Sequence, residues 1–282
     1  MVHFVGAGPG AADLITLRGL RLLQAADVLI YAGSLVNPAL LDEAKPGCAL
    51  HDSARLTLEE ILELMRAAEA AGKDTVRLHS GDPSLYGTLR EQAEALDALG
   101  IPWDVTPGVS SFCAAAAALG AEYTTPGVSQ SVILTRLAGR TAVPDGETLS
   151  ALASHGASIA VFLSAGMAEQ VRKELLADGR EHGGGKDGSE NEYTGGRRGG
   201  GYGPDTPAAI VYRASWPEEK IIRCTVDTLP AAAKAAGIHK TALILVGNFL
   251  SGAGARSRLY DPSFSTGFRQ GTEDTADRGQ DP

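Results

Sequence analysis

The stretch FVGAGPGAADLI, residues 4–15, decides how the first part of the chain folds. A short apolar run, VHFVG, leads into a glycine-rich loop, and the following TLRGLRLLQAA repeats leucine at helical spacing. A strand, a glycine-rich turn and a helix in this order are typical of parallel sheets that bind ligands at the carboxyl ends of their strands. The stretch also fits the relaxed dinucleotide fingerprint G-x-G-x-x-G/A. It therefore raises the question of whether this loop holds a nicotinamide cofactor or another small molecule.

Two features argue against a nicotinamide cofactor. Pro9 removes one backbone amide from the loop, whereas a dinucleotide site places pyrophosphate on such amides at the helix N-terminus. The nicotinamide interpretation also needs an acidic residue at the end of the second strand to hold the ribose hydroxyls. That strand is DVLIY, and AGSLVNP follows it without an acid. We therefore favour a different small molecule, with a nicotinamide oxidoreductase and a purely structural turn as the alternatives.

Composition limits the class of protein. The 282 residues suffice for a sizeable core and for two domains, and the net charge of -9 argues against a nucleic-acid binder with a broad basic face. The three cysteines lie far apart and the histidines form no ligand motif, so neither a disulfide scaffold nor a bound metal is expected. There is no signal-peptide pattern and no apolar run long enough for a membrane span. We expect a cytoplasmic protein without a membrane association.

Strand and helix signals alternate along the first half of the chain, which predicts a mostly parallel sheet. We expect an N-terminal α/β domain over residues 1–122 and a second α/β domain with a mixed sheet over residues 123–252. Within the first domain, Thr57 and Glu60 form a capping box at the start of a helix. Residues 180–204 and 253–282 are rich in glycine and polar residues, so we expect a disordered insertion and a disordered tail.

Three loops follow three predicted strands of the first domain, at Gly6–Asp13, His79–Gly87 and Thr106–Ser111. They converge on one cleft if their strands are neighbours in the sheet. Asp82 in the second loop suits ribose hydroxyls or an amine, but it could equally cap the next helix. Ser110 and Ser111 in the third loop could cap a helix, hold the polar end of a ligand, or do both.

The motifs VGAGPGAADLITLRGLRLLQAADVLIY, SGDPSLYG and TPGVSS resemble the tetrapyrrole methylase family. Longer segments, including YAGSLVNPALL, QSVILTRLAGRTAVP and ASWPEEKIIRCTV, are similar to a branch that methylates precorrins in cobalamin biosynthesis. The resemblance implies two α/β domains with a cleft between them, S-adenosylmethionine as methyl donor, an anionic tetrapyrrole substrate and a homodimer. A family member acting on another precorrin position and a non-catalytic binder of tetrapyrrole or cofactor remain open.

The resemblance also assigns residues to the cofactor site, and it explains Pro9 as part of that site. The implied cofactor-binding residues are Pro9, Ser80, Gly81, Asp82, Leu85, Ser110, Ser111, Phe162, Leu163 and Ala214. Arginine pairs well with carboxylates, so Arg136 and Arg140 are candidates for binding the substrate. Arg213 is a further candidate, although for this residue we favour the alternative of a surface or interface charge. No residue is assigned as a catalytic base.

Overall fold

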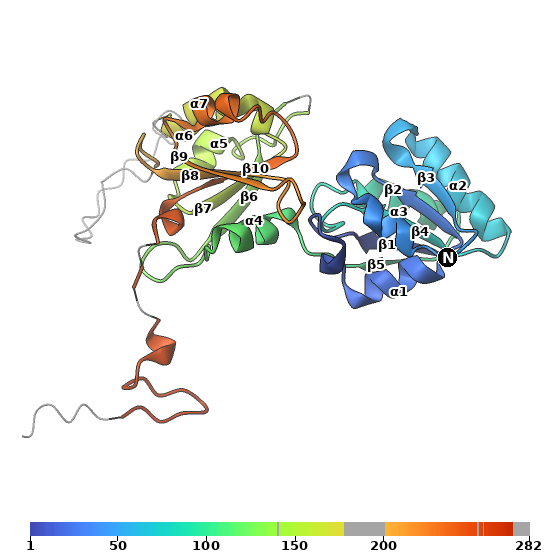
Figure 1. Cartoon of the computed structure of the whole chain (residues 1–282), viewed down its shortest axis with the longest axis horizontal. Coiled ribbons are helices and arrows are strands. Elements are labelled where there is room, and N and C mark those ends of the chain that lie inside the picture. Colours follow the sequence, from blue (N-terminus) through green and yellow to red (C-terminus); the bar gives the residue numbers. More distant parts are fainter. Residues whose placement is uncertain (140, 178–200, 253, 256, 273–282) are drawn as a thin grey trace, which may run out of the picture.

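The computed structural model describes residues 1–139, 141–177, 201–252, 254–255 and 257–272. Two β-sheets lie side by side in this part of the chain, each covered by helices (Figure 1). The predicted pair of α/β units is thus confirmed. Most of the predicted insertion at 180–204 lies outside the described residues, as does Arg140.

The first sheet is parallel throughout and has the strand order β3-β2-β4-β1-β5. Its strands are β1 (Val2–Gly6), β2 (Val28–Tyr31), β3 (Ala49–Asp52), β4 (Thr75–His79) and β5 (Trp103–Thr106). The strands that precede the three predicted ligand loops are β4, β1 and β5, and they are neighbours in the sheet. The condition for convergence of the three loops is therefore met.

Helices cover both faces of the first sheet because its strands alternate between two apolar cores. Phe4 and Ile30 face α2 (Leu58–Ala70) and α3 (Leu89–Ala98), whereas Val5 and Leu29 face α1 (Leu17–Ala25). The predicted capping box is present, since the Thr57 hydroxyl accepts a bond from the Glu60 amide and the Glu60 carboxylate accepts one from the Thr57 amide.

The second sheet is mixed, as predicted, with the order β6-β7-β10-β8-β9. Only β6 and β7 pair in parallel; the other neighbours are antiparallel. Its strands are β6 (Val132–Arg136), β7 (Ser158–Phe162), β8 (Pro207–Tyr212), β9 (Lys220–Thr225) and β10 (Ala242–Val246). One face packs against α5 (Leu149–Ala153), α6 (Ala168–Leu176) and α7 (Leu229–Ala235).

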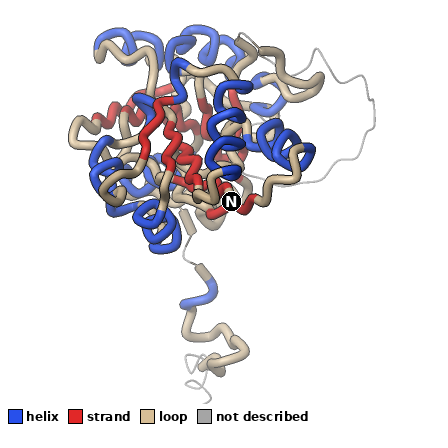
Figure 2. Tube along the Cα trace, turned by 90° about the vertical axis from the view of Figure 1, so that its right-hand side faces the viewer, coloured by secondary structure: helices blue, strands red, loops and turns tan. Residues whose placement is uncertain are grey.

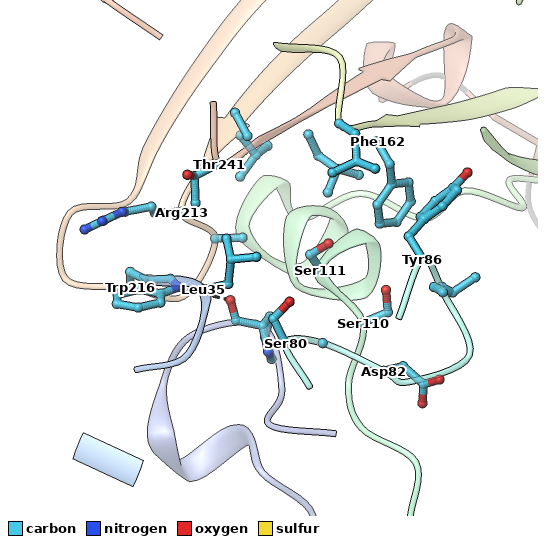
Figure 3. A pocket seen from close by; sticks show the side chains of 18 residues that line it. Leu35, Ser80, Asp82, Tyr86, Ser110, Ser111, Phe162, Arg213, Trp216 and Thr241 are labelled. Carbon is cyan, nitrogen blue, oxygen red and sulfur yellow. Dashed lines mark hydrogen bonds between the residues drawn. The ribbon is translucent and has the colours of Figure 1, made fainter. Parts of the chain in front are cut away.

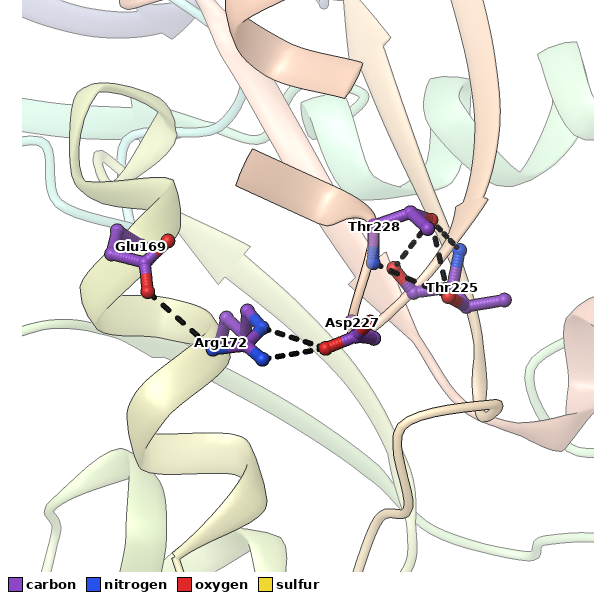
Figure 4. Close-up of polar contacts among 5 residues, drawn as sticks. All are labelled: Glu169, Arg172, Thr225, Asp227 and Thr228. Carbon is purple, nitrogen blue, oxygen red and sulfur yellow. Dashed lines mark hydrogen bonds and ion pairs between the residues drawn. The ribbon is translucent and has the colours of Figure 1, made fainter. Parts of the chain in front are cut away.

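A polar contact joins this helical layer to the sheet. The Arg172 guanidinium on α6 binds Asp227 Oδ1, with an Nε–Oδ1 distance of 3.0 Å, and approaches Glu169 (Figure 4). Thr225 and Thr228 exchange hydrogen bonds across the turn between β9 and α7. Because these charges are exposed, the apolar core contributes more to the packing than the ion pairs do.

The other face of the second sheet packs against α4 (Ser111–Leu119). The sequence predicts a domain boundary at residue 122, after this helix. However, Ala115 and Leu119 of α4 pack with Ala160 and Leu245 of the second sheet. We therefore propose that the boundary lies before α4, which places the start of that helix directly over the region between the two sheets.

The C-terminal segment extends away from both sheets (Figures 1 and 2). The sequence predicts disorder for residues 253–282. The described residues of this segment include the 3-10 helix Arg258–Tyr260 and local bonds, such as that from Arg269 Nη2 to the Leu259 carbonyl at 3.1 Å. Residues 253, 256 and 273–282 lie outside the described part.

Candidate active site

A pocket of about 240 Å³ lies between the two sheets (Figure 3). Its first wall consists of the loops that follow β1, β4 and β5. Its second wall consists of the ends of β7 and β8 and the start of β10. Since β10 runs antiparallel to both strands, all three positions lie at one edge of the second sheet. The pocket thus joins the carboxyl edge of a parallel sheet, where ligands commonly bind, to a second domain.

All ten residues that the sequence assigns to the cofactor line this one pocket. They are Pro9, Ser80, Gly81, Asp82, Leu85, Ser110, Ser111, Phe162, Leu163 and Ala214. They come from five separate segments and from both domains. The convergence shows that these motifs form a common site, and their contact with a cofactor stays a prediction.

The three loops of the first wall contact one another through their backbones. Gly8 and Gly81 exchange hydrogen bonds of 3.2 and 2.8 Å between their amides and carbonyls. A Cβ added to Gly6 would lie 2.5 Å from the Cα of Gly108, and one added to Gly108 would overlap the Gly81 carbonyl oxygen. Glycine is thus required where the loops meet because no side chain fits between them.

The side chain of Asp82 joins the loop after β4 to the loop after β5 by hydrogen bonds. Its Oδ1 accepts a bond of 2.8 Å from the Ser84 amide and another from the Ser84 hydroxyl, and its Oδ2 accepts one of 2.9 Å from the Gly108 amide. Burial raises the pKa of Asp82, but these hydrogen bonds outweigh it and leave the pKa below its usual value. The alternative in which Asp82 caps the next helix is wrong, because Thr88 is the N-cap residue of α3.

Ser110 is the N-cap residue of α4, but its side chain makes no capping hydrogen bond. The capping function weighed for Ser110 from the sequence is therefore absent, and its hydroxyl lines the pocket instead. Ser111 is the first residue of α4, and it lies beside Ser110 (Figure 3). The positive end of the α4 dipole and two hydroxyl groups thus face the pocket, where they favour polar or anionic groups of a ligand.

Aromatic and aliphatic side chains form the apolar part of the site. Tyr86 of the first domain packs against Phe162 of the second, with ring centroids 5.2 Å apart and the ring planes tilted by 48°. Leu163 is 71% exposed at the pocket and has a backbone φ of 53°. An exposed leucine held in this conformation offers apolar surface to a bound molecule.

Left-handed backbone conformations are concentrated at this site. Among the described residues, six that are not glycine have a positive φ: Tyr86, Thr88, Leu163, Arg213, Ser215 and Thr241. Four of the six line the pocket, and the other two are within two residues of a lining residue. Such conformations cost of order 1–3 kcal/mol each and persist at functional sites. Their distribution points to the pocket independently of any motif.

Of the two candidate substrate-binding arginines, only Arg136 belongs to the described residues. Arg136 does not line the pocket, and two of its guanidinium nitrogens donate to the carbonyls of Leu137, Thr141 and Ala142 at 2.7–3.1 Å. The guanidinium of Arg136 thus stabilises the segment after β6. The structure gives no support for a role of this guanidinium in binding carboxylates. Arg140 lies outside the described residues.

Sequence reasoning missed part of the lining. Arg213, interpreted as a surface or interface charge, does line the pocket, where it stacks on the Trp216 ring at 4.9 Å and pairs with Glu218. Tyr86 and Trp216 stand within the quoted motifs SGDPSLYG and ASWPEEKIIRCTV, which could have indicated them. Leu35 likewise stands within the quoted segment YAGSLVNPALL, whereas the remaining missed residues carry no local signal: Val211, Thr241, Ala242 and Leu243.

In the described ranges, His, Cys, Asp and Glu nowhere gather in a group of three that could hold a metal ion. Among the same residues, none of the helices combines the length and the apolar character needed to cross a membrane.

Comparisons with known proteins agree on one family. The sequence model of the tetrapyrrole (corrin/porphyrin) methylases matches residues 1–230. The cobalt-precorrin-4 C(11)-methyltransferase of Methanocaldococcus jannaschii is 44% identical over 95% of this chain and 96% of its own length. The precorrin-4 C(11)-methyltransferase of Rhodococcus erythropolis is 45% identical over 90% of this chain and 93% of its own.

Solved structures support the same assignment. The cobalamin biosynthetic enzyme cobalt precorrin-4 methyltransferase superposes with a TM-score of 0.78 and 43% identity over 88% of this chain and 95% of that one. A uroporphyrin-III C-methyltransferase of Thermus thermophilus, solved with S-adenosylhomocysteine, gives a TM-score of 0.64 and 25% identity over 88% and 92%. Because the family model matches residues 1–230 and relatives that are 44% and 45% identical span nearly the whole chain, the chain belongs to the tetrapyrrole (corrin/porphyrin) methylase family.

Proposed function

We propose that this protein transfers a methyl group from S-adenosylmethionine to C11 of precorrin-4 or cobalt-precorrin-4 in cobalamin biosynthesis. The observation that carries the proposal is the convergence of ten motif residues from both domains on one pocket. The relatives that are 44% and 45% identical over nearly the whole chain carry this activity in their names. A structural relative was solved with S-adenosylhomocysteine, the product that the methyl donor leaves.

The residues of the pocket fit such a cofactor. Leu85, Phe162 and Leu163 supply apolar surface for the adenosine part, while Ser110 and Ser111 supply hydroxyl groups for polar atoms. Gly81, at a φ of 65°, brings backbone close to the ligand where a side chain would keep it away. We propose that Asp82 acts mainly by shaping this wall, because both of its oxygens already accept hydrogen bonds within the protein.

When bound, the sulfonium of S-adenosylmethionine supplies an already activated methyl group. The task left to the protein is to align the methyl group with a ring carbon of the macrocycle, which is an effect of orientation. Among the residues that line the pocket, only Asp82 is a carboxylate, and its lowered pKa makes it a weak base. We therefore assign no general base, and we propose that binding and alignment dominate the catalysis by this chain.

The setting of the reaction is also part of the proposal. We propose a cytoplasmic homodimer that takes an anionic tetrapyrrole and binds neither nucleic acid nor a membrane. The support is the resemblance to the family for the dimer, and the net charge of -9 for the exclusion of nucleic acid. The two named relatives differ in whether the substrate already carries cobalt: one is named for cobalt-precorrin-4 and the other for precorrin-4.

The main alternative is methylation at another position of a precorrin by the same fold. A uroporphyrinogen-III C-methyltransferase of Bacillus subtilis is 31% identical over 89% of this chain, so relatives with other substrates exist at lower identity. A non-catalytic cofactor binder is the second alternative. The nicotinamide alternative loses its support, because Tyr31 ends β2 without an acid after it and the match to the methylase family covers residues 1–230.

The first experiment is calorimetric titration of the protein with S-adenosylhomocysteine, with NADH as the control. Precorrin-4 and cobalt-precorrin-4 are then incubated separately with S-adenosylmethionine, and the methylated carbon is located by NMR. We expect S-adenosylhomocysteine to bind and NADH not to bind. We also expect a new methyl group at C11 of one of the two substrates. A methyl group on a different carbon would establish the first alternative, and cofactor binding without turnover the second.

A further inference from the structure

One contact between the two domains lies at the end of the pocket opposite Tyr86 and Phe162 (Figure 3). The indole Nε1 of Trp216 donates a hydrogen bond of 3.0 Å to the carbonyl oxygen of Pro9. The amide of Ala11 donates one of 3.0 Å to the Ser215 hydroxyl. Residues more than 200 positions apart thus join the loop after β1 to the turn between β8 and β9.

The Trp216 side chain is itself held in place. The Arg213 guanidinium stacks on its ring at 4.9 Å and lies 5.7 Å from the Tyr212 ring centroid. Arg213 Nη1 also binds Glu218 Oε2 at 3.2 Å. A guanidinium between two aromatic rings and a carboxylate has few other positions to occupy, so it limits the movement of the indole.

Both sides of the contact are shaped for it. A Cβ added to Gly10 would overlap the Trp216 ring, so only glycine lets the indole approach. On the other side, Arg213 and Ser215 have φ values of 47° and 68°. The Ser215 amide donates 2.7 Å to Glu219 Oε2, which helps to hold the turn in this strained conformation.

We propose that Trp216 is a positioning residue, which holds the two domains at the separation that the pocket needs for the methyl donor. The inference rests on the proposed function, in which this pocket takes S-adenosylmethionine. Trp216 acts through Pro9: its hydrogen bond fixes the loop after β1 against the second domain, and Arg213 keeps the indole in the orientation that makes this bond.

This arrangement predicts a particular kinetic result. Without the Trp216 hydrogen bond, the free protein spends more time with the domains apart, and ligand binding must first restore the closed form. The apparent affinity for the ligand is then the intrinsic affinity multiplied by the fraction of protein in the closed form, so it falls. A saturating ligand concentration restores the aligned state. KM for S-adenosylmethionine should therefore rise while kcat stays nearly the same.

The decisive variant is Trp216→Phe, which keeps an aromatic ring for Arg213 and removes only the N–H donor. Trp103, the one other tryptophan of the chain, is a matched control. It lies at the start of β5, away from the pocket, and its indole N–H donates a hydrogen bond of 2.8 Å to Asp97 Oδ1. For Trp216→Phe we expect the Kd of S-adenosylhomocysteine and the KM of S-adenosylmethionine to rise together, roughly three- to tenfold. Trp103→Phe should leave both at the wild-type values.

A second measurement needs no ligand. The Ala11 amide is bonded to Ser215 only while the domains are in contact, so its hydrogen exchange in the free protein reports the contact directly. We expect faster exchange of this amide in Trp216→Phe and in Ser215→Ala, but not in Trp103→Phe.

The outcomes separate this inference from the proposed function. Unchanged exchange at Ala11 in Trp216→Phe, an equal rise of Kd in both tryptophan variants, or a fall in kcat at constant KM would each overturn the positioning role. Failure of the wild-type protein to bind S-adenosylhomocysteine would instead overturn the proposed function, and the exchange experiment would still decide whether the contact holds the domains.

Discussion

The Asp82 carboxylate accepts a hydrogen bond of 2.9 Å from the Gly108 amide and so joins the loop after β4 to the loop after β5. Both loops line the pocket, and no other side chain of the described residues is found to bond across them in this way. The carboxylate is thus part of the framework of the site. This relationship explains how a single acidic residue can matter for binding without contacting a ligand through its own oxygens.

Replacement of Asp82 tests this role. We expect Asp82→Asn to lower the free energy of unfolding by about 1–3 kcal/mol, because hydrogen bonds to a charged group are lost or weakened. The measurement is urea denaturation at neutral pH. Asp52→Asn is the matched control, since Asp52 makes the same kind of turn bond to the Ala54 amide, at 2.9 Å, without a bond to a second loop. An equal loss in both variants would contradict a special role of Asp82.

The same carboxylate predicts a dependence of stability on pH. Its pKa in the folded protein is lowered, so the folded state favours the charged form. A carboxyl group of this kind contributes full stability above its unfolded pKa and loses that contribution as the pH falls through the folded pKa. The difference in unfolding free energy between wild type and Asp82→Asn should therefore be constant near neutral pH and shrink below about pH 4. A difference that grows in acid would show that the folded pKa is raised instead.

Arg77 on β4 and Gln92 on α3 form a buried pair below the second loop. They are 6% and 2% exposed, and Arg77 Nε donates 3.2 Å to Gln92 Oε1. Burial lowers the pKa of Arg77 to about 10, and Gln92 Nε2 in turn donates 3.0 Å to the Thr88 carbonyl at the end of the loop. This pair connects the sheet to the start of α3.

A double-mutant cycle measures the coupling of that pair. Gln92→Met leaves the Arg77 guanidinium without its side-chain acceptor, and we expect it to cost about 2–3 kcal/mol of unfolding free energy. Arg77→Met together with Gln92→Met removes both polar groups, and we expect this double variant to be more stable than the sum of the single changes predicts. Strict additivity in thermal or urea unfolding would show that the two side chains are not coupled.

Relief of backbone strain should separate stability from binding. Thr241 lines the pocket with a φ of 55°, a conformation that glycine adopts without cost. We expect Thr241→Gly to raise the unfolding free energy by about 1 kcal/mol and to weaken binding of S-adenosylhomocysteine, because the pocket loses a wall. In the control Thr124→Gly, at an exposed position without a positive φ, stability should fall. A gain in the control would mean that strain at Thr241 is not the cause.

The close approach of the three loops gives the last prediction. Gly108→Ala places a methyl group onto the Gly81 carbonyl oxygen, so we expect loss of S-adenosylhomocysteine binding and a marked fall in melting temperature. Gly267→Ala has open space around its added methyl group and should change neither property. Retention of binding in Gly108→Ala would mean that the loops can separate without damage to the site.

The sequence predicts most of the first wall because its signals are local. Glycine and proline mark the loops, and the strands before them are apolar, so the convergence of Pro9, Asp82 and Ser110 follows from the order of parallel strands. The strand β3 escapes prediction because Ala49–Asp52 is short, half-exposed and at the sheet edge, which leaves little apolar pattern to detect.

The second wall could be predicted only from resemblance. The contact of Trp216 with Pro9 joins residues 207 positions apart, and no local pattern encodes such a pairing. Arg136 shows a different difficulty: its residue type suits carboxylates, but two of its guanidinium nitrogens already donate to carbonyls of the following segment. Residue chemistry alone cannot distinguish a free guanidinium from one that the chain itself has used.

The backbone contacts among Gly6, Gly81 and Gly108 also bear on how such a site can diverge. At these three positions the backbones meet without side chains between them, so a larger residue at Gly6 or Gly108 would push the loops apart. Variation that keeps glycine at these three positions can instead fall on the side chains that line the pocket from either domain.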